Sequence, residues 1–419
     1  MSIDSYKASH AAFAVADAPW LASARAQALQ HFEQAGFPTI KHEAWKYTST
    51  KALQKVPFAH TGTAGHVQAA LQGVDAHRLE GAAAELVFVN GQLVQELSRV
   101  EGLPSRVSLT GLMAAMQGPA ALKLKPLLGA DDALDDQPFD ALNLAFLQDG
   151  ALVEIRRDAD VQAPIHLLFL THSGGDPVVS HPRVVVLAGR HSRATVVERH
   201  VSLGSGATFG NVVSQVSLAD GAGLTHHVVH QGNDTSFHRG HVRATVGRSA
   251  TYTSGAWWLG GSWARQDLDI TLAAEGALPA PPLLAVPVGR HGDFAGVLPA
   301  VLVAQHVGEG QHLVRGVASA EHALGQDLGA GLQALSRADH LAGGVGAGGG
   351  VAGQALHQPQ GSRRALVAAR VGLEQGVGEA VGEGVDQAVQ ALVHPQGGRL
   401  QGHDRPEHGV EGATLAAGA

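Results

Sequence analysis

The chain has 419 residues, enough for two or three domains with a large core, and its formal net charge of −8 argues against general nucleic-acid binding, which favours basic surfaces. It contains no cysteine, which excludes a disulfide framework, a thiolate metal site and a cysteine nucleophile. The first residues lack the order of a signal peptide, and the apolar stretch 276–289 holds four prolines and is too short to span a bilayer, so we expect a soluble cytoplasmic protein that does not bind membranes.

Residues 1–83 are predicted to form a helical N-terminal region with a linker. Residues 17–35 have the spacing of an amphipathic helix, which Gly36 and Pro38 end. Its apolar stripe consists of Leu21, Ala24, Ala28 and Phe32, with Leu29 at the edge. The Gly-, Ala- and Gln-rich residues 61–83 are expected to form a linker and a short helix.

Four lysines and two aromatic residues follow the predicted helix: Lys41, Trp45, Lys46, Tyr47, Lys51 and Lys55. Such a pattern is found in nucleic-acid patches that stack bases on aromatic rings. The alternative is an exposed basic edge whose Trp and Tyr anchor the segment to the body. Because the charges are few and the whole chain is acidic, we favour the basic edge.

A hairpin and a helical stretch come next. Residues 85–89 read as a strand, Asn90-Gly91 is a strong tight-turn signal, and residues 92–97 would return antiparallel. Residues 108–127 are predicted to be helical, with a break near Gly118-Pro119.

Residues 84–276 form a strand-rich body without helical patterns of ten or more residues in its main part, residues 141–276. Short runs rich in Val, Ile and Thr recur between turn residues, as expected of strands. They are 151–155, 165–170, 183–187, 195–198, 212–218, 225–230, 241–246 and 268–272. Since βαβ units need intervening helices, the remaining folds are a sandwich, a barrel or a β-helix.

The composition changes in residues 277–419. From His291 onward 27 of 129 residues are Gly, there is no Ile, Lys, Asn, Tyr, Trp or Met, and Phe294 is the only aromatic residue. The pattern is typical either of GC-rich DNA read in a wrong frame or of a low-complexity tail. Stripes at 324–335 and 377–389 predict weak helices or disorder, because each Gly costs a helix roughly 1 kcal/mol.

Histidines raise the question of a metal site. His226, His227 and His230 form the densest cluster, but on a strand His226 and His230 lie about 13 Å apart and His227 faces the other way. Neighbouring strands could add His238 or His241. We favour polar residues on a solvent-facing strand, and the nine histidines from His291 onward lack metalloprotease spacing.

Other chemical motifs are weak. Asp267 and Asp269 share a strand face with Arg265, so they could serve as the paired carboxylates of a β-helical carbohydrate-active enzyme, but a charged, solvated strand face is the simpler interpretation. The dipeptide Gly-Lys never occurs, which excludes a P-loop, and the match of Gly344, Gly346 and Gly349 to GxGxxG lies in a Gly tract without a preceding strand.

Several segments in order resemble one known family, over about residues 20–276. Near the start, Gly36-Phe37-Pro38, Lys41, Glu43 and Trp45-Lys46-Tyr47-Thr48 resemble a GLPxxKxExWKYT signature. The further segments are Val87–Gly91 with Leu97-Ser98, Ala141-Leu142-Asn143, Ala145-Phe146, Asp149-Gly150, Pro164–Leu167, Pro182-Arg183, Glu198, Val201-Ser202, Leu259–Gly261 and Ala264–Leu268. The family is SufD, a non-catalytic scaffold subunit of the Suf iron–sulfur cluster assembly machinery.

The resemblance implies a mainly β protein, a right-handed parallel β-helix with an α-helical N-terminal region. Here we expect the β-helix to be incomplete, and the composition predicts that a Gly/Ala-rich tail of low order follows it. It also implies a complex with a SufB-like paralogue and a SufC-like ATPase, in which an iron–sulfur cluster is held transiently and this chain alone binds no cofactor. The family's later segments, including its cysteine- and histidine-containing motif, are not found after Gly276. No catalytic, cofactor-binding or metal residue can therefore be assigned, and a non-functional, truncated SufD-like chain is a further alternative.

Overall fold

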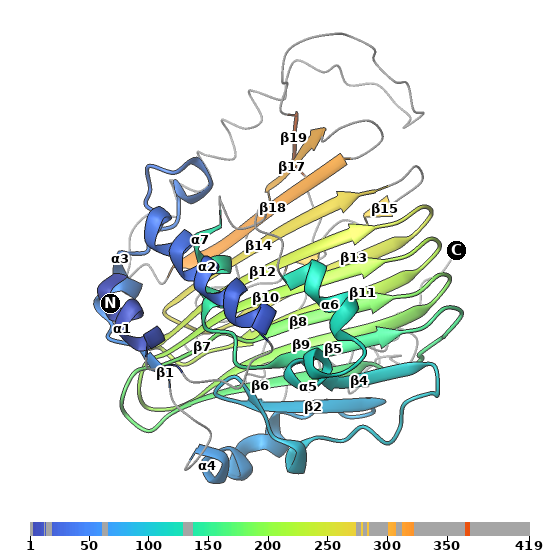
Figure 1. Cartoon of the computed structure of the whole chain (residues 1–419), viewed down its shortest axis with the longest axis horizontal. Helices are drawn as coiled ribbons and strands as arrows, with labels where there is room; N and C mark the ends of the chain where they lie inside the picture. The colour runs from blue at the N-terminus through green and yellow to red at the C-terminus, as the bar shows by residue number, and fades with distance from the viewer. Residues whose placement is uncertain are drawn as a thin grey trace, which may run out of the picture. The chain divides into compact units, whose positions relative to one another are not determined.

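The computed structural model describes residues 3–11, 13, 19–60, 66–128 and 137–273, and the strand segments 278–279, 283–284, 301–306, 312–321 and 365–368. Parallel strands dominate this part of the chain (Figure 1). The predicted helices at 324–335 and 377–389, the histidines from His291 onward other than His306 and His312, and the GxGxxG match lie outside the described residues.

The body is a parallel β-helix of about four turns, in which consecutive long strands alternate between two sheets. One sheet, called sheet A, contains β5 (Gly150–Ile155), β8 (Arg183–Ala188), β10 (Thr208–Leu218), β12 (Ser236–Val246) and β14 (Trp263–Leu272). The other, sheet B, contains β6 (Ile165–Ser173), β9 (Arg193–Gly204), β11 (Gly223–Gln231) and β13 (Thr251–Leu259). The predicted β-helix is thereby confirmed.

Each turn of the chain adds one parallel strand to each sheet. In sheet A, Val213 lies beside Arg183 of β8 and His241 of β12, and in sheet B, Val196 of β9 lies beside Ile165 and His226. Most side chains of these strands are buried on both faces, which explains why the sequence runs are nearly continuous in Val, Ile and Leu rather than cleanly alternating.

Alternate side chains fill the space between the sheets. The apolar half of this interior contains Leu167, Val186, Val216 and Leu224, all buried. Polar side chains occupy the other half: Glu198, His200, Ser214, His226, His230 and His238 are also buried there. The interior is thus divided along the strands into an apolar and a polar half.

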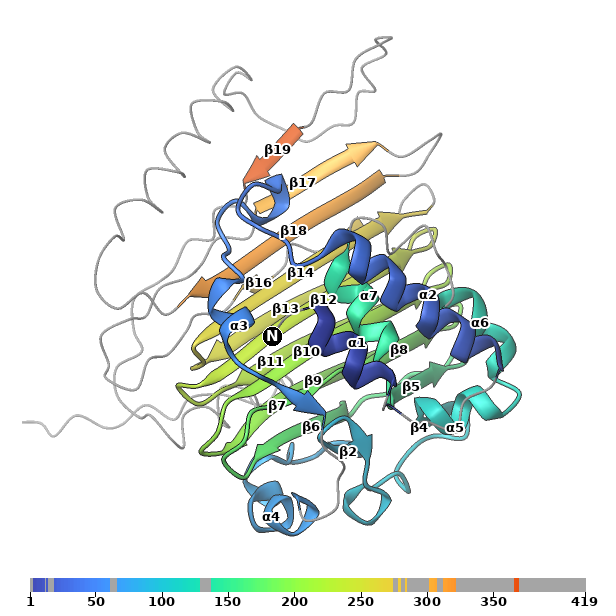
Figure 2. The same ribbon diagram turned by 60° about the vertical axis from the view of Figure 1, so that its left-hand side comes forward.

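Helices cover the outer face of sheet A (Figure 2). They are α1 (Ile3–Ala11), α2 (Pro19–Ala35), α5 (Leu112–Gln117), α6 (Ala121–Leu128) and α7 (Pro138–Ala145). The stripe of α2 predicted from the sequence is buried, and it shares a second core with Phe139 of α7 and the outward-facing Phe209, Phe237 and Trp263 of sheet A. The helices therefore pack their apolar side chains against the outer face of sheet A and form a second hydrophobic core with it.

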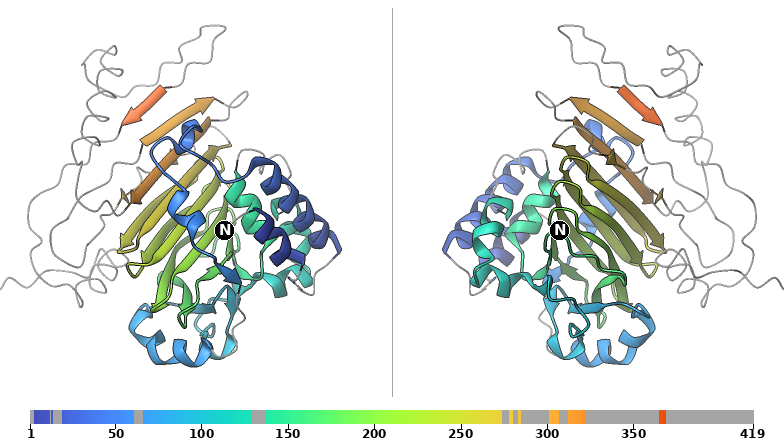
Figure 3. Two further views of the ribbon diagram at one scale, coloured as in Figure 1. Left: turned by 90° about the vertical axis from the view of Figure 1, so that its left-hand side faces the viewer. Right: turned by 90° about the vertical axis from the view of Figure 1, so that its right-hand side faces the viewer.

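The N-terminal side of the β-helix is closed by a hairpin and short elements. β2 (Ala84–Val89) pairs parallel with β6 and antiparallel with β3 (Gln92–Leu93). Asn90 and Gly91 both have positive φ, 49° and 83°, as the predicted two-residue turn requires. α4 (His66–Gly73), at the lower end of both views in Figure 3, packs Ala70 against Val87 and Leu168.

Three local predictions were wrong or incomplete. Residues 108–111 belong to a strand, β4 (Val107–Gly111), because they pair antiparallel with β5. The return strand of the hairpin ends at Leu93, and a short 3-10 helix, η3 (Gln95–Leu97), follows. β13 and α7 had not been predicted.

The parallel order of sheet A stops at β14. Its next neighbour, β18 (His312–Glu321), runs antiparallel to it over ten residue pairs, and β17 (Val301–His306) and β19 (Ala365–Ala368) continue antiparallel. Sheet B ends in the two-residue strands β15 (Leu278–Pro279) and β16 (Leu283–Leu284) beside β13. These strands beyond Gly276 had not been predicted from the sequence.

Candidate functional site

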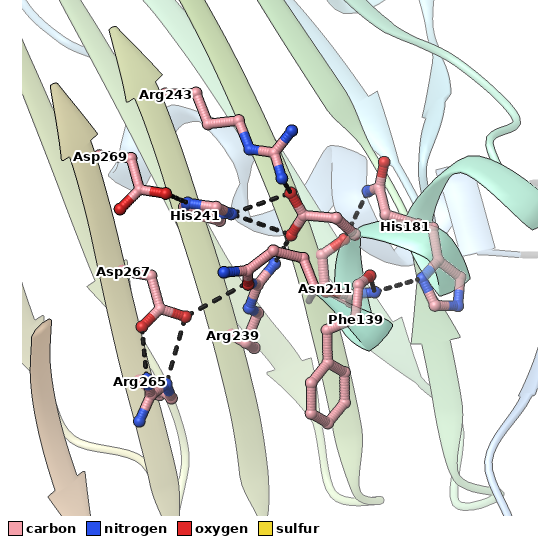
Figure 4. A network of polar contacts seen from close by, with 12 residues as sticks. Phe139, His181, Asn211, Arg239, His241, Arg243, Arg265, Asp267 and Asp269 are labelled. Atoms are coloured by element: carbon pink, nitrogen blue, oxygen red, sulfur yellow. Dashed lines mark hydrogen bonds and ion pairs between the residues drawn. The ribbon is translucent and has the colours of Figure 1, made fainter. Parts of the chain in front are cut away.

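A buried network of charged residues lies between α7 and the outer face of sheet A (Figure 4). Its centre is Asp140, in the first turn of α7. The carboxylate accepts hydrogen bonds from Nδ1 of His241 at 2.8 Å, and it forms ion pairs with Nη2 of Arg243 at 2.9 Å and with Arg239. All three partners extend from the outward face of β12, because residues two apart on a strand point the same way.

The charges in this network stabilise one another. Burial alone would raise the pKa of Asp140, but His241, Arg239 and Arg243 hold it well below its usual range. Burial would likewise lower the pKa of His241, but the charge and hydrogen bond of Asp140 raise it above the ordinary value. An ionised carboxylate inside a protein requires such pairing, so the network fixes α7 on β12.

The network continues to β14 and to the N-terminal segment. Asp267 lies 3.2 Å from Nη2 of Arg239 and 2.6 Å from Nη2 of Arg265. Arg265 also donates to the carbonyl oxygen of Ala44 at 2.9 Å and to Oγ1 of Thr48 at 3.1 Å. Residues more than 200 positions apart are thereby joined through one guanidinium.

The pair Asp267 and Asp269 does share a strand face, as predicted, but that face is not solvated at Asp267. The predicted solvent-facing strand was wrong there because the N-terminal segment and α7 cover it. Burial would raise the pKa of Asp267, but Arg265 and Arg239 lower it, so it stays ionised. Asp269 pairs with Nε2 of His241 at 3.3 Å. A paired, buried carboxylate cannot reach a sugar, so the geometry does not favour a carbohydrate-active enzyme.

Amide groups attach α7 to the neighbouring turns. Nδ2 of Asn143 donates to the carbonyl oxygens of Pro182 at 2.9 Å and Asn211 at 2.8 Å, while its Oδ1 accepts from Nε of Arg183 at 2.9 Å. Nδ2 of Asn211 in turn donates to the carbonyl oxygen of Phe139 at 2.7 Å. The segments Ala141–Asn143 and Pro182-Arg183, which carry part of the family resemblance, meet in these contacts.

The histidines of β11 are buried, and the predicted solvent-facing strand was wrong for them as well. β11 lies between β9 and β13, so both of its edges are paired, and His226, His227 and His230 are buried on its two faces. His226 points into the interior, where Nε2 lies 2.7 Å from Glu198 and Nδ1 lies 2.9 Å from the hydroxyl of Tyr252. His227 faces outward against Trp257, so the two neighbours do point to opposite faces, as predicted.

Three interior histidines from successive turns form a second cluster. The ring of His238 lies 4.4 Å from that of His230 and 5.1 Å from that of His200, between centroids, whereas His241 is on the other face of β12. Gly210 leaves room for the ring of His238, because a Cβ there would lie 3.2 Å from its Nδ1. Burial and the neighbouring His200 lower the pKa of His230 to about 3, so its imidazole is neutral.

A small cavity adjoins these rings. It is lined by Phe169, Thr171, Ser180, His200, His230 and His238, among others. Within the part of the chain that the structure describes, Nδ1 of His230 and Nε2 of His238 have no hydrogen-bond partner. No three His, Asp or Glu side chains of the described residues are arranged to hold a metal ion, so the cluster does not form a ready metal centre.

Residues 39–55, here called the lysine-rich segment, follow α2. Trp45 is buried and stacks 3.9 Å from the guanidinium of Arg265, so it anchors the segment as predicted. Tyr47 does not: its exposed fraction is 75%. Lys41, Lys46, Lys51 and Lys55 are all exposed, which agrees with the predicted basic edge.

Asp140 and Glu198 were not assigned roles from the sequence, although both centre buried networks. The available signal was a lone acid in an apolar run, PFDALNLA for Asp140 and TVVERHV for Glu198. Burial would raise the pKa of Glu198, but His226 and His200 lower it to about 2.

In the described residues no helix is both long and apolar enough to cross a bilayer.

Two family models match the chain in tandem. The SufBD protein N-terminal region matches residues 2–167, and the SufBD core domain of the SUF system for FeS cluster assembly matches residues 169–318. The second match extends past Gly276, where the resemblance had been expected to end, and it ends close to the end of β18 at Glu321.

Proteins of three bacteria are similar to this chain. An iron–sulfur cluster assembly SufBD family protein of Synechocystis is 28% identical over 249 residues, which cover 57% of this chain and 53% of that protein. The iron–sulfur cluster assembly protein SufD of Escherichia coli is 29% identical, covering 62% and 59%, and SufD of Bacillus subtilis is 24% identical, covering 50% and 48%. The chain thus spans about half the length of these relatives.

Proposed function

Because this chain belongs to the SufBD family of iron–sulfur cluster assembly proteins, we propose that it is a non-catalytic scaffold subunit in that process. It would act in the cytoplasm, in a complex with a SufB-like paralogue and a SufC-like ATPase. The observation that carries the proposal is the match of both family regions, in order, to the N-terminal region and to the β-helix.

The arrangement of polar groups supports a structural rather than a catalytic role. Asp140, Asp267 and Glu198 are buried and paired with cationic or imidazole groups, so none is free to abstract a proton from a substrate. Residues that carry the family resemblance, such as Asn143 and Arg183, contact one another. Their role in the proposal is to hold the helical region on the β-helix.

The iron–sulfur cluster belongs to the complex in this proposal. The chain has no cysteine, so thiolate ligands would have to come from a partner. Iron and sulfide are the cargo of the reaction, and this subunit supplies a rigid surface against which its partners assemble.

Cluster reconstitution tests the proposal. The purified chain, the SufB-like paralogue and the SufC-like ATPase are each supplied with ferrous iron and sulfide, separately and together, under anaerobic conditions. We expect no cluster absorption from this chain alone and more cluster from the complete complex than from the two partners without it. Equal cluster formation with and without the chain would contradict the proposal.

A further inference from the structure

We propose that the lysine-rich segment, residues 39–55, is a docking surface for an acidic segment of a partner protein. Four of the seven lysines in the chain lie within this span of 15 residues from Lys41 to Lys55, and Glu43 is the only acidic residue among them. Four positive charges and one negative charge give the segment a formal charge of +3, in a chain whose net charge is −8. Such a local excess attracts acidic partners and orients them on approach.

The four lysines are not used inside the molecule. Among the described residues none of them forms an ion pair, whereas Lys7 pairs with Glu33 and Lys123 with Glu154. Lys46 lies 5.6 Å from the ring of its neighbour Tyr47, a contact that leaves its charge uncompensated. Their positive charge is therefore available to a partner.

Exposed apolar side chains accompany the charges. Tyr47 has an exposed fraction of 75% and Ile40 one of 57%. Few other large apolar residues are exposed in the described part of the chain. Tyrosine is enriched in protein interfaces, where it supplies a large contact area at low entropic cost. Lysines beside exposed apolar side chains match an acidic protein segment that also carries apolar residues, whereas a free ion would gain nothing from the apolar contacts.

The backbone beneath these side chains is held in place. Trp45 packs on Arg265 and Phe139, Nε1 of Trp263 donates to the carbonyl oxygen of Ser49 at 3.1 Å, and Oγ1 of Thr50 donates to the carbonyl oxygen of Pro38 at 2.8 Å. A surface ordered before binding loses little entropy when the partner arrives. The segment is thus held in place from beneath, while its four lysines form no ion pair with any residue that the structure describes.

Nucleic acid is the weaker alternative for this surface. It contains one exposed aromatic residue and no arginine, and stacking platforms for single strands use successive aromatic rings in a basic groove. The acidity of the remaining chain would also repel a polyanion longer than the segment.

Fluorescence anisotropy with the full chain tests the proposal. The probe is a labelled peptide rich in Glu and Leu, compared with the same peptide carrying Gln for Glu and with single-stranded DNA. We expect the Glu peptide to bind, to bind more weakly at high salt, and to bind better than both other probes. Absence of binding, equal binding of the Gln peptide, or tighter binding of DNA would each overturn the proposal.

Matched variants locate the binding surface. Lys46→Glu is expected to weaken binding about five- to tenfold and Tyr47→Ala about tenfold. Their controls are Lys125→Glu, the same charge change at an exposed lysine of α6, and Leu122→Ala, which removes a side chain that is 86% exposed there; both are expected to bind like the parent chain. Equal effects of segment and control variants would overturn the proposal. Self-association of the chain that Lys46→Glu abolishes would also overturn it, because a second copy of the chain would then bind the segment.

Discussion

The guanidinium of Arg265, on β14, lies 3.9 Å from the ring centroid of Trp45, which is 220 positions earlier in the chain. The same guanidinium binds Asp267, Thr48 and the backbone of Ala44. The segment that most resembles the family signature therefore closes over the last parallel strand of sheet A. This relationship gives the signature a physical meaning, since it joins the N-terminal region to the β-helix.

Asp140→Asn should destabilise the protein strongly. The substitution leaves Arg239 and Arg243 without their shared carboxylate, and breaking a buried ion pair costs about 3–5 kcal/mol. The free energy of unfolding from urea titration measures the loss. The control is Asp158→Asn, at an exposed acid paired with Arg157, for which we expect less than about 1 kcal/mol. Equal losses at the two positions would show that the network does not hold α7.

Asp267→Asn and Asp269→Asn separate the scaffold from the carbohydrate-active alternative. We expect the parent chain to hydrolyse no polysaccharide, and Asp267→Asn to lower the free energy of unfolding more than Asp269→Asn, because Asp267 is the more deeply buried and pairs with two arginines. Reducing-sugar assays and urea titrations are the measurements. Turnover by the parent chain that Asp267→Asn abolishes would establish an enzyme instead.

The interior histidines predict loss of stability in acid. The pKa of folded His230 is lowered to about 3, below its unfolded value of about 6.5. The contribution of His230 to the free energy of unfolding is therefore complete above pH 6.5 and is lost as the pH falls toward 3. Between pH 7 and pH 5 the protonation of this group in the unfolded chain lowers the free energy of unfolding by about 2 kcal/mol.

The variant His230→Gln, which does not titrate, checks this dependence. Its free energy of unfolding should fall less between pH 7 and pH 5 than that of the parent chain, while the exposed-site variant His191→Asn should follow the parent. Because the readout is a difference between two pH values, a constant packing defect does not affect it. Identical pH dependence in all three proteins would contradict a neutral, buried His230.

Limited proteolysis with mass spectrometry tests where the family-like chain ends. The core-domain match ends at residue 318 and β18, which pairs with β14, ends at Glu321. We expect a protected fragment that reaches Glu321 or beyond, whereas a fragment that ends near Gly276 would support the boundary predicted from the sequence, with the regions 1–83, 84–276 and 277–419. Reading the DNA in all frames past the codon for Gly276 distinguishes an off-frame translation from a genuine tail.

The sequence was informative where local physics decides the structure. The stripe of α2, the Asn90-Gly91 turn and most strands of the β-helix follow from periodicity and turn chemistry. Exposure was not predictable in this way. Asp267 and His226 sit on polar-looking strands, yet the N-terminal segment and α7 cover Asp267, and His226 points into the interior, where it contacts Glu198 and Tyr252. Pairing partners such as Asp140 and Arg239 are 99 positions apart, and no local pattern specifies that they meet.

Native mass spectrometry of this chain co-expressed with its SufB-like paralogue and SufC-like ATPase tests the central claim most directly. A scaffold subunit of the SufBD family should appear in one complex whose mass contains all three proteins. Detection of the folded chain only as a free species, while the two partners assemble without it, would contradict the proposed function and identify this chain as a family member that no longer acts as a scaffold.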